Sequence, residues 1–366
     1  MDGQPSPPAP PVRAGRRWIV ALLLGLVGFT AVIGSSLLGT VAIPVRTGVE
    51  ILLHQMSGGA LFPAPCAGTG VSVAHCGALT FIVWNLYLPE VLLALIVGAA
   101  LGISGGALQG VFRNPLADPF LLGISSGGTL GAAILYVYRI QEAHADLFLP
   151  LFAFVGATAT GLLILAVARG RYSSVETLLL TGVAISNLLS ALLSLVLLYN
   201  PVGGEQVTFW LLGSLGSADW EVDGIAFGIV LALGTVLALY GRELNLLQLG
   251  SDVAQSAGVD APRVRLVVIL LASLTTAVAV AFTGIIGFVG LVSPHIVRRV
   301  AGTDYRVVLP GSAAVGAIFL LTARDVSYLA FPSSLLPIGI FTAFAGVPFF
   351  LYLLLRQRRG TTMGTT

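Results

Sequence analysis

The sequence predicts an all-α membrane protein that crosses the bilayer about ten times, with both termini in the cytoplasm. Of its 366 residues, 56% are apolar and 9% are charged, whereas about 25% are charged in soluble domains. So few charges could not cover the surface of a soluble fold of this size. The apolar residues gather in runs of about 20, the length of a transmembrane helix.

The runs follow one another along the chain after a proline-rich start. Residues 1–17 contain too little apolar surface to bury, so we expect a disordered cytoplasmic tail. The first span is predicted over 18–38; a cleaved signal peptide is the alternative, although its apolar core would be unusually long. Residues 39–87 are less hydrophobic and predict an extracytoplasmic loop. Nine further runs cover 88–110, 120–138, 147–168, 177–199, 222–240, 264–284, 285–297, 307–328 and 335–355.

One apolar stretch, Leu266 to Val297, is too long for one span and too short for two. Gly284, Gly287, Gly290 and Pro294 interrupt it. We therefore expect a full span followed by a shorter, broken one, an arrangement that transporters use.

The arginines predict the orientation of the spans. With the N-terminus in the cytoplasm, fifteen arginines fall inside and only Arg46, Arg139 and Arg324 fall outside, as the positive-inside rule requires. All 18 basic residues are arginine, so a P-loop lysine is excluded and any ATP must be bound by another chain. The arginines stand at the ends of apolar runs, which does not indicate nucleic-acid binding.

Both cysteines, Cys66 and Cys76, lie in the predicted extracytoplasmic loop. An oxidising compartment there permits a disulfide that closes a small loop, and two free thiols are the alternative. A metal site formed with His75 would use suitable ligand types, but nothing in the spacing demands it.

The sequence offers little support for chemistry inside the membrane. The hydrolase motif HExxH is absent. The ionisable residues Glu90, Asp118, Arg324 and Asp325 stand near predicted span ends, whereas an ion-coupled carrier needs carboxylates near mid-membrane. Small residues repeat at helical spacing over 98–133, which predicts close helix packing.

The cytoplasmic segment 241–265 predicts a docking site for another protein. Ser251 can cap a short helix, Asp252 falls in its first turn, and Gly258 can end it. An amphipathic helix pair on this face is suited to contact a partner, and an ordinary connecting loop is the alternative.

Six segments carry a resemblance to a known family. They are GAALGISGGALQGVFRNPLADPFLLGISSGGTLGAA (98–133), LLLTGVAIS (178–186), WLLGSLGSADW (210–220), LNLLQLGSDVAQSAGV (244–259), GIIGFVGLVSPHIVRR (284–299) and LPIGIFTAFAGVPFFLYLLLR (336–356). In this order and spacing they resemble the FecCD-type permease subunits of binding-protein-dependent ABC importers, which carry iron–siderophores, haem and vitamin B12. RNPLADP (113–119) is the most characteristic part.

The resemblance implies a vitamin B12 permease-like (type II ABC importer) fold in the bacterial plasma membrane. The permease domain would cover 18–356, with a cytoplasmic tail over 357–366. Its partners would be a second permease subunit in a homodimer or heterodimer, two cytoplasmic ATP-binding subunits, and an extracytoplasmic substrate-binding protein. ATP and magnesium would bind to the ATP-binding subunits, so this chain would not be an enzyme and would bind no cofactor or metal.

The resemblance also assigns roles to particular residues. The ATPase-coupling loop of the family matches Leu249, Gly250, Asp252, Ala254 and Gly258, and its cytoplasmic gate matches Ser173, Ser174 and Val175. Other positions that match family motifs are Arg113, Asn114, Pro115, Asp118, Pro294, His295, Pro337, Gly339, Gly346 and Pro348. Residues 178–198 and 338–350 would line the transport path. For His295 we favour a structural role, capping or bonding a carbonyl freed by Pro294, over metal binding.

The chain differs from the family at three positions where family members carry arginines that pair with acidic residues of the binding protein. Tyr87, Glu90 and Leu329 occupy those positions here. Arg324, Arg46 or Arg139 could substitute, or a different permease subunit could supply the arginines. We expect ATP-driven alternating-access import of an iron–siderophore-type chelate. The alternatives are vitamin B12, haem, a metal ion or an oxyanion as the substrate, and a secondary transporter or channel as the class.

Overall fold

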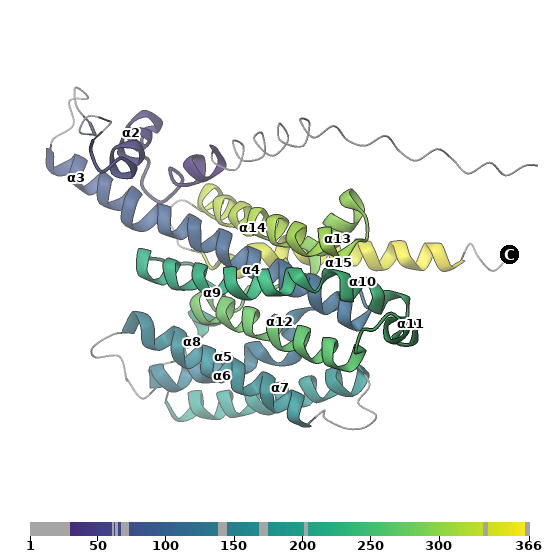
Figure 1. Cartoon of the computed structure of the whole chain (residues 1–366). Helices are drawn as coiled ribbons and strands as arrows, with labels where there is room; N and C mark the ends of the chain where they lie inside the picture. Colours follow the sequence, from purple (N-terminus) through teal and green to yellow (C-terminus); the bar gives the residue numbers. More distant parts are fainter. Residues whose placement is uncertain are drawn as a thin grey trace, which may run out of the picture.

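The computed structural model describes residues 30–60, 62, 65–66, 73–137, 145–167, 175–200, 204–331 and 336–362, and these residues form helices and turns without β-strands. Figure 1 shows the long helices lying roughly parallel in one bundle. In chain order the helices are α2 (Val45–Met56), α3 (Val73–Phe81), the π-helical η1 (Ile82–Tyr87), α4 (Leu88–Phe112), the 3₁₀ turn η2 (Pro119–Leu122), α5 (Ile124–Val137), α6 (Ala145–Val167), α7 (Val175–Tyr199), α8 (Gly204–Leu211), α9 (Trp220–Leu239), α10 (Gly241–Leu249), α11 (Ser251–Ser256), α12 (Ala261–Thr283), α13 (Val289–Ala301), α14 (Tyr305–Ala330) and α15 (Ile338–Thr362).

Several of these helices can cross a membrane. Among the described residues, six helical segments are long and apolar enough: His75–Phe112, Phe148–Val167, Glu176–Tyr199, Trp220–Leu239, Ala261–Thr283 and Tyr305–Ala330. Ile124–Val137 and Ile338–Tyr352 are apolar but shorter. Each predicted run from 88–110 onward coincides with a helix, so the protein is all-helical as predicted. Most of the first predicted span, and the whole of 1–17, lie outside the described residues, so ten spans and cytoplasmic termini stay predictions.

Helices occupy much of the segment 39–87, which the sequence predicts as an extracytoplasmic loop. Residues 45–56 form α2, and α3, η1 and α4 follow one another without a break from Val73 to Phe112. The helix continues through Pro89, although proline lacks the N–H group for a helical hydrogen bond and its ring crowds the carbonyl of Asn85. The π-helical turn directly before Pro89 provides the altered backbone spacing that lets the helix continue.

The predicted break in the stretch 266–297 is confirmed, and its position is at Gly284. Helix α12 ends at Thr283, Gly284 has φ 72°, and α13 begins at Val289. Pro294 was predicted to interrupt this stretch, but it lies inside α13 and does not end that helix. The span predicted over 120–138 is also shorter, because Gly123 with φ 67° separates η2 from α5.

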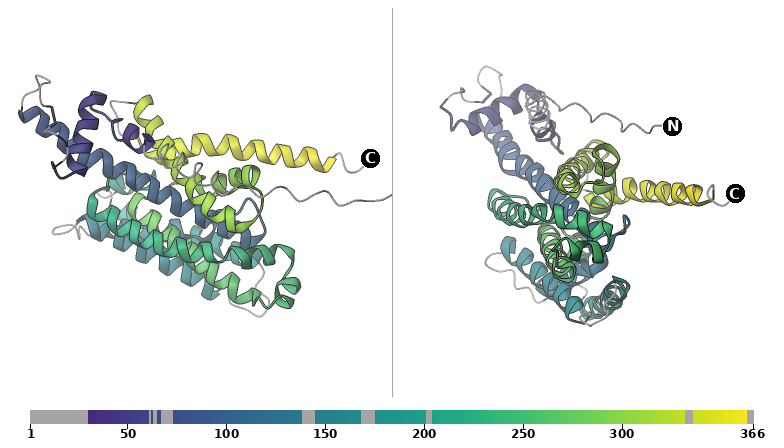
Figure 2. Two further views of the ribbon diagram at one scale, coloured as in Figure 1. Left: turned by 45° about the horizontal axis from the view of Figure 1, so that its top comes forward. Right: turned by 45° about the vertical axis from the view of Figure 1, so that its right-hand side comes forward.

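Helix α4 lies at the centre of the bundle, in contact with α9, α12, α13 and α14. Glycines let α4 and α14 approach closely: a Cβ on Gly98 would lie 2.3 Å from the carbonyl oxygen of Gly316, and one on Gly102 would lie 2.1 Å from that of Ser312. The predicted packing role of the small residues is therefore confirmed. Helix α7 lies at the edge of the bundle (Figure 2). Only 6% of its 18-residue apolar segment is buried.

Candidate functional site

The helix pair α10–α11 lies at one end of the bundle (Figure 1). Helix α13 and the beginning of α12, the helix that follows α11 in the chain, lie at the same end. Side-chain hydrogen bonds fasten α10 to its neighbours. Asn245 Nδ2 donates to Asp304 Oδ1 at 2.6 Å, and Asn245 Oδ1 accepts from the N–H of Tyr305 at 2.9 Å. Gln248 Nε2 donates to the carbonyl of Gly110, at the end of α4, at 2.7 Å. The pair is thus fixed to both α4 and α14.

Glycines form the bends at the two ends of α11. Gly250 has φ 127° and Gly258 has φ 81°, values that only glycine adopts without strain. The N–H of Gly258 donates to Gln255 O and that of Val259 to Ala254 O, which is a Schellman ending. Gly258 therefore ends the helix as predicted.

Ser251 does not cap α11, in contrast to the prediction. Gly250 occupies the N-cap position and makes no side-chain bond. The Oγ of Ser251 instead accepts a hydrogen bond from Arg265 Nη2 at 2.8 Å, so it connects α11 to α12. Asp252 does lie in the first turn of α11, where its negative charge suits the helix dipole.

The pair has an outer face and an inner face. Leu249 is 67% exposed and Val253 is 44% exposed, whereas Ala254 is completely buried. Asp252 is also exposed. Exposed apolar side chains next to a charge, on a segment that is otherwise well fastened, are typical of a protein-docking surface.

The RNPLADP segment forms a compact turn between α4 and η2. Arg113 ends α4 with φ 51°, and Asn114 Oδ1 accepts from the N–H of Leu116 at 2.9 Å. Asp118 Oδ1 accepts from the N–H of Phe120 at 2.8 Å and so caps η2. Burial raises the pKa of the Asp118 carboxyl to about 6, against the smaller lowering effect of that hydrogen bond. Pro115 is exposed at the tip of this turn.

The carbonyl that Pro294 leaves without a partner is satisfied by Gln109, and not by His295. Gln109 Nε2 donates to Gly290 O at 3.2 Å and to Leu291 O at 3.4 Å. The predicted carbonyl-bonding role of His295 is wrong, since its Nε2 has no hydrogen-bond partner and its ring meets Phe349 edge-on. A signal for Gln109 existed in the sequence: a lone amide in an apolar run requires partners from another segment.

The motif residues before and inside α15 fit closely against neighbouring backbone. The N–H of Ile338, directly after Pro337, donates to Gly213 O at 3.0 Å. A Cβ on Gly339 would lie 2.3 Å from Leu212 O, and one on Gly346 would lie 2.2 Å from the Phe288 ring. Pro348 lies within α15. These residues therefore position the helix that the resemblance places beside the transport path.

At the opposite end of α4, four residues form what we call the outer charge cluster: Glu90, Arg324, Asp325 and Tyr328. Arg324 Nη2 donates to Glu90 Oε2 at 2.9 Å, and its Nη1 donates to Asp325 Oδ1 at 3.1 Å. The same Nη1 donates to the carbonyl of Ser35 at 2.6 Å. Tyr328 donates from its hydroxyl to Glu90 at 2.9 Å, and its ring lies 4.6 Å from the Arg324 guanidinium.

This cluster removes one of the predicted substitutes for the missing arginines. Arg324 is 0% exposed, so it cannot reach an acidic residue of another protein. Tyr87 is also buried, and its hydroxyl accepts from the N–H of Val41 at 2.9 Å. Arg46 remains accessible, because its side chain is 81% exposed although it pairs with Glu50. Arg139 lies outside the described residues.

A cavity of about 960 Å³ opens beside the outer charge cluster. Its walls come from η1, α4, α5, α6, α8, α12 and α14, and from the turns after α8 and before α15. The aromatic side chains among its lining residues are Tyr87, Tyr136, Phe209, Trp210, Phe282 and Tyr328, and the charged ones are Glu90, Glu205 and Arg324. The cavity is thus lined by aromatic, aliphatic and polar side chains together.

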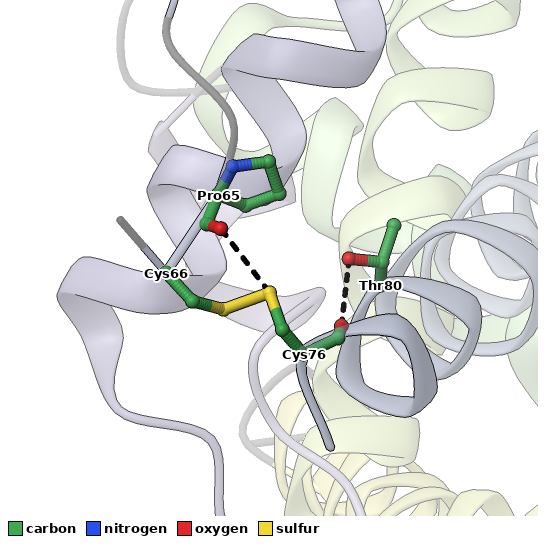
Figure 3. Close-up of a disulfide and its surroundings, with 4 residues drawn as sticks. All are labelled: Pro65, Cys66, Cys76 and Thr80. Carbon is green, nitrogen blue, oxygen red and sulfur yellow. Dashed lines mark hydrogen bonds between the residues drawn. A yellow bond between two sulfur atoms is a disulfide. The ribbon is translucent and has the colours of Figure 1, made fainter. Parts of the chain in front are cut away.

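Cys66 and Cys76 form a disulfide, with their Cα atoms 6.2 Å apart (Figure 3). The alternative of a metal site at this position falls away because both sulfurs are used. Among the described residues, no group of three or more His, Cys, Asp or Glu residues could hold a metal ion. Of the three predicted gate residues, Ser173 and Ser174 lie outside the described residues, as does the side chain of Val175, the first residue of α7.

Apolar membrane-length helices define a multi-pass membrane protein. The chain belongs to the FecCD transport family, whose sequence model matches residues 21–356. It is similar to the cobalamin import system permease protein BtuC of Halobacterium salinarum, with 38% identity over 331 residues that cover 86% of this chain and 85% of the relative.

Two other similarities agree with this membership. The hemin transport system permease protein HmuU of Yersinia pestis is 40% identical over 280 residues, which cover 75% of this chain and 84% of HmuU. A solved structure assigned to the metal-chelate type of ABC transporter, in an inward-facing conformation, matches with a TM-score of 0.69 and 28% identity. That match covers 85% of this chain and 97% of the other. The protein is therefore an ABC importer permease.

Proposed function

We propose that this chain imports an iron–siderophore-type chelate as one of two permease subunits that enclose a path across the bacterial plasma membrane. Two cytoplasmic ATP-binding subunits bind ATP and magnesium and drive alternating access, and an extracytoplasmic binding protein delivers the chelate. Cobalamin or haem is the alternative substrate, because relatives at 38% and 40% identity are named for those compounds.

The observation that carries this proposal is the construction of α10–α11. Its apolar outer face, with Leu249 and Val253, is available to a partner. Its inner face is bonded to α4 through Gln248 and to α14 through Asn245. A push on the outer face therefore moves the bundle rather than a loose loop. Such a push drives transport when the contact differs between two states of the assembly.

Helix α7 supports the existence of a path between two subunits. Asn187, Ser190 and Ser194 are exposed and lie on one face of this membrane-length helix, at spacings of three and four residues. Polar side chains in a membrane usually face the interior of an assembly or a water-filled cavity. This face of α7 therefore fits the wall of an aqueous path completed by a second permease subunit.

The size of the outer cavity supports a bulky organic chelate. About 960 Å³ is at the upper end of the range for small-molecule sites, and a bare ion needs far less. The aromatic side chains in its lining suit the flat or ring-bearing surface of an organic ligand.

Bulky residues in α10–α11 test the coupling. Ala254 is completely buried, so Ala254→Phe should displace α11 from the bundle; Gly250→Val should distort the bend at φ 127°. We expect uptake by proteoliposomes with the whole complex to fall at least about tenfold, while the chain still inserts in the membrane. Ser256→Ala, an exposed position, is the control. Full uptake in both bulky variants would contradict the coupling role.

The same proteoliposomes distinguish the substrates and the transport class. Uptake of labelled ferric siderophore, cobalamin and haem is compared with and without ATP inside the vesicles. We expect ATP-dependent uptake of the siderophore. Uptake that continues without ATP would favour a channel or secondary carrier, and ATP-dependent uptake of cobalamin or haem alone would replace the proposed substrate.

A further inference from the structure

We propose that a basic pocket beside α10 receives an acidic side chain of the ATP-binding subunit, with Arg113 and Arg298 as its ligands; this inference rests on the proposed function. The pocket has a volume of about 500 Å³. Residues that line it come from α4, the turn after α4, α10, α13 and the start of α14, and include Gln109, Arg113, Gln248, Arg298, Asp304 and Tyr305.

The two arginines lack a counter-ion in the described part of the chain. Neither Arg113 nor Arg298 forms an ion pair there, and Nη1 of Arg298 is buried without a hydrogen-bond partner. A buried guanidinium nitrogen without a partner costs free energy. An anion that enters the pocket would remove this cost.

Asp304 also lines the pocket, but its carboxylate is already committed. Its Oδ1 accepts from Asn245 Nδ2 at 2.6 Å and from the N–H of Arg306 at 2.9 Å. These two hydrogen bonds lower the pKa of Asp304, so the carboxylate stays charged while it holds α10 against α14. Two guanidinium groups and one carboxylate leave the lining with a net positive charge.

Gln109 holds the guanidinium of Arg298 in place, whereas Arg113 is exposed at the end of α4. The side chain of Gln109 accepts a hydrogen bond from Arg298 Nη2, which fixes that guanidinium and leaves Nη1 for a ligand. Arg113 adopts φ 51°, a left-handed conformation that is strained for a residue with a Cβ. Strain of this kind gathers at functional sites. Arg265, near enough to Arg113 for mutual repulsion, adds positive potential.

The position of the pocket indicates a protein occupant. Leu249 lines the pocket and is also 67% exposed on the outer face of α10–α11. A partner that covers this face therefore also covers the mouth of the pocket. Carboxylates are well suited to such a site, because guanidinium and carboxylate groups form paired, charge-assisted hydrogen bonds.

The test measures the affinity of the purified permease, as the full chain in detergent, for its ATP-binding subunit. Arg113→Glu should raise the Kd about tenfold or more, since it reverses a charge in the interface. Arg299→Glu is the matched control, because Arg299 is exposed on the same helix as Arg298 and does not line the pocket; its Kd should stay within about twofold. Arg113→Gln should also reduce the salt dependence of binding.

A second set of variants separates folding from recognition. If Arg113→Glu weakens binding, exchange of one acidic residue of the ATP-binding subunit for arginine should restore it, which a misfolded permease would not allow. Equal weakening by Arg113→Glu and Arg299→Glu would overturn the pocket as a specific site. Wild-type affinity in Arg113→Glu and Arg298→Gln, with loss in Leu249→Asp, would overturn the pocket and keep the docking role. Absence of binding by the unmodified chain would remove the proposed function itself.

Discussion

Arg324 is the largest of the fully buried side chains, and it carries a charge. Two carboxylates, a carbonyl and a tyrosine ring surround its guanidinium. Burial of an ion pair is expensive, and such a pair is stable only when the remaining donors and acceptors are satisfied. Here Tyr328 adds a hydrogen bond to Glu90 and Ser35 Oγ donates to Asp325 Oδ2 at 2.5 Å, although the buried Nε of Arg324 has no hydrogen-bond partner in the described residues. The network therefore connects the segment before α2 to α4 and α14.

Removal of one member of this network should cost more than removal of two. Glu90→Leu leaves the buried Arg324 with a single carboxylate, and Arg324→Met leaves Glu90 without its cation. We expect each single change to destabilise the protein by about 3–5 kcal/mol, and the double change Glu90→Leu with Arg324→Met to cost less. Thermal unfolding in detergent measures this. A double variant as unstable as the sum of the two single variants would show that the charges do not interact.

At the scale of the helices, packing depends on glycines that face other backbones. Gly98 and Gly316 each lie where a Cβ would meet the carbonyl oxygen of the other, at 2.3 Å and 2.2 Å. In the same way, Gly127 of α5 faces Gly156 of α6, with 2.4 Å to its carbonyl oxygen. Backbone atoms cannot move aside as side chains do, so these positions accept only glycine. Close packing of this kind replaces the hydrophobic driving force that lipid does not provide.

The effect on stability of replacing a glycine with alanine should depend on the atoms that the new Cβ would meet. Gly98→Ala and Gly316→Ala should each destabilise the bundle by about 1–3 kcal/mol or more, because α4 and α14 must move apart. Gly224→Ala and Gly228→Ala in α9 are matched controls, since a Cβ there meets nothing within 4 Å, and alanine favours the helix by about 0.5–1 kcal/mol. Unfolding midpoints in detergent compare the four variants. Similar midpoints in all four would contradict the packing argument.

At the scale of the whole molecule, a single chain leaves much of the surface of its membrane-length helices exposed. Helix α7 exposes Leu188, Leu192 and Leu195 on one face and Asn187 and Ser190 on another. Lipid suits the first set and disfavours the second. The second permease subunit proposed above would enclose water with the polar face and so account for both.

Cysteine labelling tests this arrangement. The two native cysteines are joined in the disulfide, so an introduced cysteine is the sole free thiol when no reductant is present. Asn187→Cys and Ser190→Cys should react with a membrane-impermeant thiol reagent in the assembled transporter, because the path contains water. Phe227→Cys and Leu231→Cys in α9 are exposed apolar controls and should react at least about tenfold more slowly in lipid. Equal rates at all four positions would contradict a path along α7.

The sequence by itself determined the properties that depend on neighbouring residues. Hydropathy over about 20 residues locates the helices, Gly284 ends α12 where a positive φ is needed, and glycines at 250 and 258 form the bends at the two ends of α11. The motifs, too, are continuous stretches, so the family was predicted correctly. The continuous helix through Pro89 was missed because a π-helical turn depends on a shift in backbone hydrogen bonding that no single residue type signals.

Only the tertiary structure decided which polar groups meet. Gln109 bonds Gly290 across 181 positions, and Arg324 pairs with Glu90 across 234. An unpaired polar group in an apolar environment requires a partner, but the sequence does not say which one, because helix packing brings distant segments together. Arg324 therefore looked available for docking and is buried, and His295 looked suited to the carbonyl that Gln109 satisfies.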